Sequence, residues 1–201
     1  MKVFFTAILL AIFSAPSFAA TTSAEDEVKK FINNVGNQVI SIAAEKNIPE
    51  SRVLTKIVSL VERSIDLEWI ARFVLAKNYK TATPQEIERF TKLYRDFMIN
   101  TYGVKFKNYN RRKFDVQSVT QQGGFYLAKA EFLPLNSNTP ISIDFRVKER
   151  AGKLVIVDFI AEGVSLIETQ RSEFNSAISQ DGMDEFLDSL EQRVKKLHHP
   201  A

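Results

Sequence analysis

The spacing of apolar residues changes twice along the chain, and this change constrains the fold more than any other feature. Over 24–109 apolar side chains recur every three to four residues, as they do on one face of an α-helix. Over 112–161 they alternate with polar side chains, as in half-buried strands, and the helical spacing returns over 168–197. Helices, then a run of strands, then closing helices is the order of an α+β protein.

Local start signals predict where the helices of the first half begin. Asp66 stands before an apolar run and can cap a helix. The strongest signal is Thr83-Pro84-Gln85-Glu86, in which Thr83 and Glu86 form a capping box and Pro84 suits the first helical turn. An aromatic-rich helix is expected to follow, and to end at Gly103 or to continue past it.

The alternating region predicts a four-stranded antiparallel meander. Gly123-Gly124 marks a hairpin turn between the first two strands. The last strand is apolar on both faces except at Asp158, so both faces of the sheet are expected to be covered there. The strands are expected around 114–116, 125–133, 141–148 and 154–161.

Residues 1–19 have the pattern of a secretory signal peptide. Lys2 gives a positive start, 3–13 is an apolar run broken only by one threonine, and Ala19 ends a small-residue cleavage motif. The run is shorter than the ~20 residues that a spanning helix needs. We therefore expect cleavage after about Ala19, export of the chain, and a single domain over 20–201.

The composition excludes several kinds of chemistry. The chain has no cysteine, and its only histidines are His198 and His199, so a disulfide framework, a thiol nucleophile and a catalytic triad in the core are excluded. With 27 basic against 24 acidic residues the charge gives no reason to expect nucleic acid. No cofactor and no metal is expected.

A basic cluster follows the aromatic-rich helix and is interleaved with Phe106 and Tyr109. In an exported chain it is interpreted as a solvated face, a contact for anionic lipid headgroups or a docking patch. Its members are Lys105, Lys107, Arg111, Arg112 and Lys113.

Asp158 is the one candidate for catalysis. A carboxyl group in a dry pocket acquires a raised pKa and could act as a general base beside Tyr94 or Tyr102. We favour a plainer interpretation, in which Asp158 is paired with an arginine or hydrogen-bonded to a neighbouring strand end.

Two segments together resemble a known family. The first is Phe-Val-Leu-Ala-Lys-Asn-Tyr-Lys-Thr-Ala-Thr-Pro at 73–84, and the second, at 158–167, contains the run Asp-x-x-x-Glu-Gly-Val-Ser. They are similar to the MlaC family, also called toluene-tolerance auxiliary proteins, of the Gram-negative periplasm. The resemblance extends over essentially the whole mature chain. The family usually has glycine where Ala76 stands and often tryptophan where Leu154 stands.

The resemblance implies a periplasmic phospholipid carrier and not an enzyme. Such a carrier moves a diacyl phospholipid between an inner-membrane ABC-type transport complex and an outer-membrane lipoprotein complex, and so maintains outer-membrane lipid asymmetry. The implied fold joins a helical part to a sheet like the roll of nuclear transport factor 2, with the acyl chains between sheet and helices. A protein-only interaction module with a solid aromatic core is the remaining alternative.

The apolar stripes and this implied fold together predict the cavity lining. Because Ile143, Phe145 and Val147 share one strand face, the cavity is expected on that face. The predicted lining residues are Val74, Leu75, Phe90, Tyr94, Phe97, Phe125, Leu127, Ile143, Phe145, Val147, Ile156, Val164 and Ile167.

Overall fold

The structure is a computed structural model that describes residues 23–103, 113–133 and 138–198. The first helices are α1 (Ala24–Ala43), α2 (Glu50–Ser64), α3 (Leu67–Leu75), the 3₁₀-helix η1 (Ala76–Lys80), α4 (Pro84–Met98) and the π-helical η2 (Ile99–Gly103). The strands are β1 (Lys113–Gln122), β2 (Phe125–Leu133), β3 (Ile141–Arg150), β4 (Lys153–Ala161) and β5 (Val164–Ser165). The closing helices are α6 (Leu166–Asp181) and α7 (Met183–His198).

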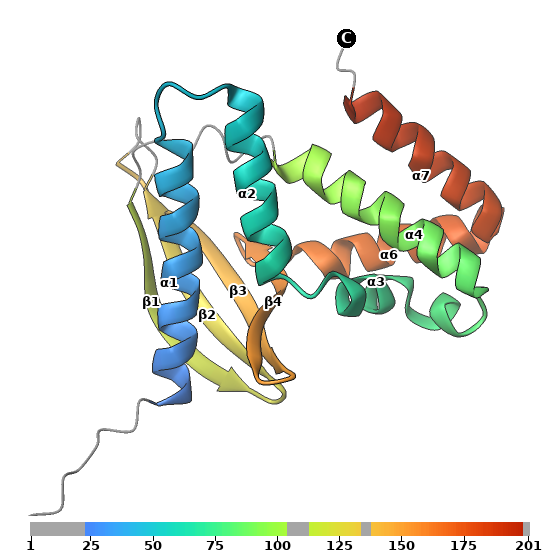
Figure 1. Ribbon diagram of the computed structural model, residues 1–201. Helices are drawn as coiled ribbons and strands as arrows, with labels where there is room; N and C mark the ends of the chain where they lie inside the picture. Colours follow the sequence, from blue (N-terminus) through green and yellow to red (C-terminus); the bar gives the residue numbers. More distant parts are fainter. Residues whose placement is uncertain (1–22, 104–112, 134–137, 199–201) are drawn as a thin grey trace, which may run out of the picture.

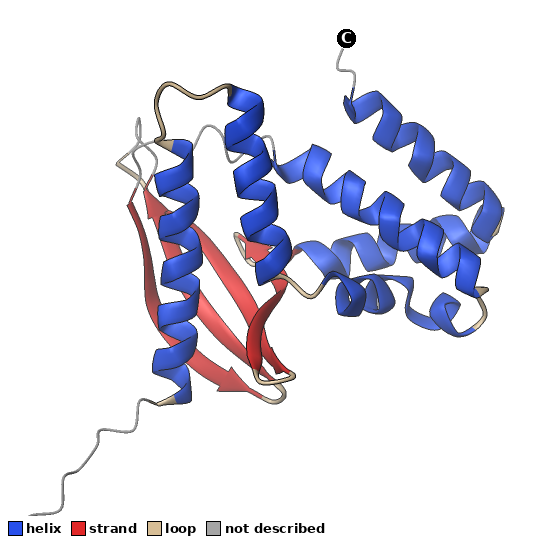
Figure 2. Cartoon of the chain, in the orientation of Figure 1, coloured by secondary structure: helices blue, strands red, loops and turns tan. Residues whose placement is uncertain are grey.

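The predicted α+β class is confirmed, with helices before and after an antiparallel sheet (Figure 2). Among the described residues no helix is both long and apolar enough to cross a bilayer. The predicted signal peptide and the basic cluster up to Arg112 lie outside the described residues. So does the predicted continuation of the helical part over 104–109.

The sheet is a meander with the strand order β1-β2-β3-β4-β5, which is one strand more than the sequence predicted. Glu162 and Gly163 take positive φ values of 50° and 81°, and the resulting turn lays Val164 beside Ala161. The fifth strand is only two residues long. A pair this short has no alternation to detect, which is why the sequence did not reveal it.

Two of the predicted helix starts are confirmed. The Thr83 hydroxyl accepts a hydrogen bond from the Glu86 amide at 3.2 Å, and the Thr83 amide donates to the Glu86 carboxylate at 2.6 Å. Pro84 occupies the first turn. Asp66 caps α3 by accepting from the Trp69 amide at 2.9 Å. Because each cap depends on residues within a few positions, short-range sequence signals were sufficient.

The helices gather in two places (Figure 1). Helices α1 and α2 lie on one face of the sheet, whereas α3, α4, α6 and α7 form a group beyond β4. Strand β4 contacts α2, α3 and α6, and its Ile156, Val157 and Asp158 are buried. The prediction that both faces are covered at this strand is confirmed.

Each group of helices has its own hydrophobic core. The sheet core, between α1 and the sheet, consists of Val28, Ile32, Val116, Ala128, Ala130, Phe145, Val147 and Ile156. The helical core, among α3, α4, α6 and α7, consists of Ile70, Ala71, Val74, Leu75, Phe90, Tyr94, Phe97, Ile167, Phe174, Ile178, Phe186, Leu187, Leu190 and Val194. A smaller cluster, Ala43, Val53 and Ile57, joins α1 to α2. Ile65 packs against both large cores.

Candidate functional site

A pocket of about 310 Å³, here called the seam pocket, lies between the helical core and the sheet. It opens on the sheet face opposite α1, because its Leu127 and Arg146 are cross-strand partners while the next pair, Ala128 and Phe145, belongs to the sheet core. Its lining residues are Trp69, Phe73, Gln122, Phe125, Leu127, Arg146, Val157, Ile167 and Glu168.

Three aromatic rings make one wall of the seam pocket. Trp69 and Phe73 are four residues apart on α3 and therefore lie on one side of it, with ring centroids 5.3 Å apart and nearly parallel planes. Phe125, from the start of β2, meets Trp69 edge-on at 6.0 Å. The wall thus joins a helix of the helical core to the sheet by apolar contact.

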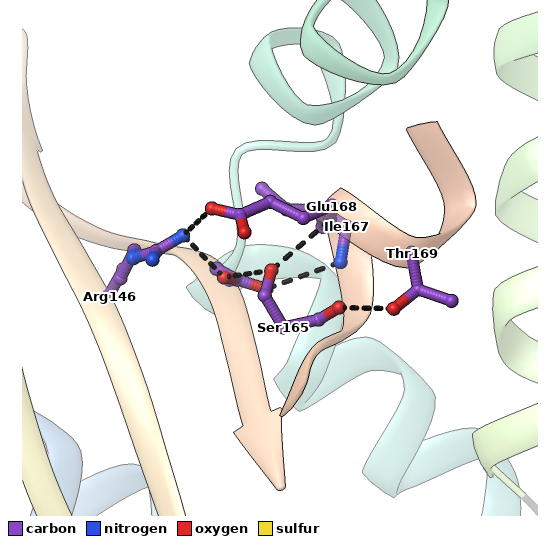
Figure 3. A network of polar contacts seen from close by, with 6 residues as sticks. Arg146, Ser165, Ile167, Glu168 and Thr169 are labelled. Atoms are coloured by element: carbon purple, nitrogen blue, oxygen red, sulfur yellow. Dashed lines mark hydrogen bonds and ion pairs between the residues drawn. The ribbon is translucent and has the colours of Figure 1, made fainter. Parts of the chain in front are cut away.

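A polar network connects β3, β4 and the start of α6 (Figure 3), and its Arg146 and Glu168 also line the seam pocket. The side chain of Asp158 is fully buried. Its carboxylate accepts hydrogen bonds from the Ser165 hydroxyl at 2.7 Å, Arg146 Nη1 at 3.0 Å and the Ile167 amide at 3.3 Å. Arg146 also contacts Glu168 at 2.6 Å. The prediction that Asp158 is paired with an arginine is confirmed.

Burial raises the pKa of Asp158, because desolvation outweighs the opposing effects of Ser165, the Ile167 amide and Arg146. The carboxylate faces three donors, so it holds the beginning of α6 against β4. Tyr94, which the catalytic hypothesis placed beside Asp158, donates its hydroxyl hydrogen to Gln170 instead. Burial also raises the pKa of the Tyr94 phenol. The described hydrogen bonds of Asp158 thus tie β3, β4 and the start of α6 together.

The structure divides the predicted lining residues into separate groups. Those on the seam pocket are Phe125, Leu127 and Ile167, of which Ile167 also belongs to the helical core. Those buried in the helical core are Val74, Leu75, Phe90, Tyr94 and Phe97. Those in or against the sheet core are Ile143, Phe145, Val147 and Ile156. Val164 belongs to none of these groups and is 62% exposed on β5.

The seam pocket thus lies on the other face of the sheet from the one on which the lipid cavity was predicted, and the lining over Ile143, Phe145 and Val147 stays a prediction. Ile143, Phe145 and Val147 do share a face, as predicted, but that face packs against α1. Alternation identifies which residues of a strand point together. It carries no information on which side a distant helix will cover.

Several pocket residues were not predicted as lining. Trp69 and Phe73 carried a usable signal, because aromatic residues four apart on a short helix present a single surface. Arg146 also carried one, since a buried acid such as Asp158 requires a cationic or donor partner on an adjacent strand. Nothing local in the sequence pointed to Gln122 or Val157.

A second and more open pocket, here called the outer pocket, adjoins the seam pocket through Glu168. Its volume is about 460 Å³, and it lies between η1 and α6. Its lining residues are Ala76, Lys77, Glu168, Arg171, Ser172 and Asn175. The lining of the outer pocket thus holds two cations, Lys77 and Arg171, and one carboxylate, Glu168, which it shares with the seam pocket.

The fold and site define an α+β protein with an aromatic-walled pocket where a sheet meets a helical group. Comparison with known proteins adds the family. The sequence profile described as MlaC protein matches residues 33–192. The chain belongs to the MlaC family.

Two relatives illustrate this relationship. The chain is 22% identical over 136 residues to the intermembrane phospholipid transport system binding protein MlaC of Haemophilus influenzae, covering 66% of this chain and 64% of that protein. It is 20% identical over 140 residues to the toluene tolerance protein ttg2D of Pseudomonas putida, covering 68% and 65%. The chain thus spans slightly less than two thirds of the length of each.

A solved structure shares the fold. It is that of a phospholipid-binding protein from Ralstonia solanacearum in complex with a phospholipid. The TM-score is 0.71, at 18% sequence identity, with 88% of this chain and 99% of that chain covered.

Proposed function

We propose that this chain is a periplasmic phospholipid carrier that holds acyl chains at the seam between the sheet and the helical group. The observation that carries the proposal is the seam pocket itself, which has an apolar wall of Trp69, Phe73 and Phe125 and shares Glu168 with an outer pocket that Lys77 and Arg171 line. Membership of the MlaC family supports it, as does a shared fold with a protein that was solved with phospholipid bound.

The energetics of a lipid explain why such a carrier needs partners but no catalytic group. Two acyl chains hold roughly 30 methylenes, and at ~0.8 kcal/mol each the free energy of transferring them from water to hydrocarbon has an upper bound of about 24 kcal/mol. Release into water is therefore prohibitive. Transfer of the acyl chains from a bilayer to an apolar pocket changes the free energy little, because both environments are apolar. The carrier must dock at each membrane, on an inner-membrane ABC-type complex and on an outer-membrane lipoprotein complex.

The seam pocket is expected to widen when lipid enters. At about 310 Å³ it is at the lower end of the roughly 300–1,000 Å³ typical of ligand pockets, and a diacyl lipid is a large ligand. The described contacts that tie α3 to the sheet include the Asp66 amide to the Ile156 carbonyl at 3.2 Å, and Arg150 to Asp66 at 3.3 Å. The Asp158 network ties α6 to it. We infer that the helical group moves away from the sheet as the seam pocket fills.

The test is native mass spectrometry of the exported chain, purified without detergent, with lipid extraction in parallel. We expect a stoichiometric adduct at phospholipid mass. A lipid-free mass that stays unchanged after incubation with vesicles would overturn the proposal, and the aromatic residues would then form solid cores only.

A pair of variants tests where the lipid lies. Leu127→Trp should fill part of the seam pocket and lower lipid occupancy several-fold, since Leu127 lines it and is only partly buried. Ile143→Trp is the matched control, because Ile143 packs on the α1 side of the sheet. Occupancy is compared by native mass spectrometry on variants shown to be folded by circular dichroism. Loss of lipid in Ile143→Trp alone would place the acyl chains on the α1 side.

A further inference from the structure

We infer that this carrier selects lipids whose headgroup bears a net negative charge, and that Lys148 and Arg171 provide the selection. The inference rests on the proposed function and concerns the part of the ligand that stays outside the seam pocket.

Lys148 lies against two rings of the seam pocket wall. Its ammonium nitrogen is 5.3 Å from the centroid of the Trp69 ring and 5.0 Å from that of Phe125, two of the rings that line the pocket. The side chain is partly exposed. Among the ion pairs of the described residues none involves Lys148. A cation over aromatic faces keeps its charge available to an anion.

Arg171 occupies the corresponding place on α6. Its guanidinium carbon is 4.6 Å from the centroid of Phe73, the third ring of the wall, and the residue lines the outer pocket with Lys77. Within the described part of the chain neither Arg171 nor Lys77 has a carboxylate within ion-pair distance. Two cations from separate elements, β3 and α6, are thus held against one aromatic wall.

The charges around the two pockets do not cancel. Asp158 and Glu168 share a single arginine, Arg146, which leaves at most one carboxylate charge in excess. Against it stand Lys148, Arg171 and Lys77. The field at the opening is therefore positive, and the low-dielectric aromatic wall strengthens it locally.

This field discriminates between headgroups by their net charge. A phosphate group alone gains contact with Lys148 or Arg171. A zwitterionic headgroup brings an ammonium group into the same positive field and loses much of that gain. The chemistry that fits the opening is a phosphodiester without a compensating cation.

The experiment presents both kinds of headgroup at once. Delipidated protein is incubated with vesicles of equimolar phosphatidylglycerol and phosphatidylethanolamine with identical acyl chains, and the bound lipids are quantified by native mass spectrometry. The wild-type chain should be enriched in phosphatidylglycerol. The double variant Lys148→Gln/Arg171→Gln should lose this enrichment by up to about fivefold per charge, the range for exposed charge pairs. Enrichment in the wild type should also weaken as salt is raised.

The matched control is Lys29→Gln/Lys30→Gln, which removes the same charge from α1, whose residues do not line either pocket. It corrects for attraction of the whole protein to anionic vesicles, and it should keep the wild-type lipid ratio. Equal amounts of the two lipids on the wild-type chain would overturn the inference, and so would an equal loss of phosphatidylglycerol enrichment in the two double variants. In either case, protein that still carries lipid would uphold the proposed carrier function. Absence of both lipids would overturn the proposed function and this inference with it.

Discussion

The helical core and the sheet core of this protein differ in the side chains that fill them. The helical core is aromatic, with Phe174 in ring contact with Phe90, Tyr94, Phe97 and Phe186 at centroid distances of 5.2–6.2 Å. The sheet core is mostly small and aliphatic, with alanine and valine on the strands facing α1. Aromatic rings fill space with few residues, whereas short side chains let a helix approach a sheet closely.

The comparison explains where the seam pocket lies. A phenylalanine-rich sequence suggested rings lining a cavity, but the rings of the helical core contact one another and are buried. The sheet core is closed by α1. The seam pocket is found where the two cores meet, and its own rings, Trp69, Phe73 and Phe125, are a separate set.

The largest expected effect comes from removing the central ring of the helical core. Phe174→Ala should lower the free energy of unfolding by about 3–5 kcal/mol, because the ring is buried among four others and a cavity would remain. The measurement is urea denaturation followed by circular dichroism. Ile32→Val in the sheet core is the smaller deletion for comparison, at about 0.5–1.5 kcal/mol. A loss below about 1 kcal/mol for Phe174→Ala would mean that the helical core is loosely packed.

The next effect tests the polar link between the two regions. Asp158→Ala removes the acceptor of the Ser165 hydroxyl and the Ile167 amide, and should cost about 2 kcal/mol. The raised pKa gives a second signature. Because the folded-state pKa lies above the unfolded value, the stability linked to protonated Asp158 is fully present below the unfolded pKa. It is lost as pH rises through the folded pKa.

The difference in stability between the wild-type chain and Asp158→Asn should therefore change with pH. The difference in free energy of unfolding between the two chains is expected to be largest at acid pH and to shrink toward neutrality. Denaturation curves between pH 3 and 7 measure it. A difference that grows with pH would mean that the three donors dominate over burial at this carboxylate.

Gly36→Ala tests the packing of the sheet core by adding a side chain where the earlier variants remove one. A β-carbon at Gly36 would stand 2.3 Å from Cδ1 of the Phe114 ring, so the ring or α1 must shift. Overpacking costs about 1–3 kcal/mol, while replacing a helical glycine by alanine contributes about 1 kcal/mol in the other direction. We expect a net loss of about 1 kcal/mol in urea denaturation. Gly124→Ala, at an open turn position with no atom within 4 Å, is the control and should be nearly neutral. A gain in Gly36→Ala would mean that Phe114 moves freely.

Two confirmed predictions rest on causes that can be read from the sequence alone. The capping box at Thr83 and Glu86 depends on four consecutive residues, and the partner of Asp158 follows from the cost of an unpaired buried charge. Sequence reasoning had no means of deciding how distant elements are placed in space. The side of the sheet that α1 covers separates Phe145 from Leu127, and no spacing along β2 or β3 encodes it. Whether an aromatic ring fills a core or lines a pocket likewise depends on how distant elements pack together, which spacing along the chain does not encode.

Ala76 gives the smallest and most local prediction, at the join between α3 and η1. Its φ of 53° and ψ of −122° belong to a region that is populated almost only by glycine, and holding alanine there costs about 1–3 kcal/mol. Glycine removes that strain. It also gives the unfolded chain more conformational freedom, which lowers the gain in stability by about 0.4–1 kcal/mol. Ala76→Gly should therefore stabilise the protein by about 1 kcal/mol in urea denaturation.

The position of Ala76 gives this substitution a second use. Ala76 lines the outer pocket and directly follows the helix that carries Trp69 and Phe73. If its strain helps α3 to leave the sheet, Ala76→Gly should slow lipid exchange between protein and vesicles while raising stability. Unchanged exchange in a more stable variant would mean that the strain at Ala76 does not contribute to lipid exchange.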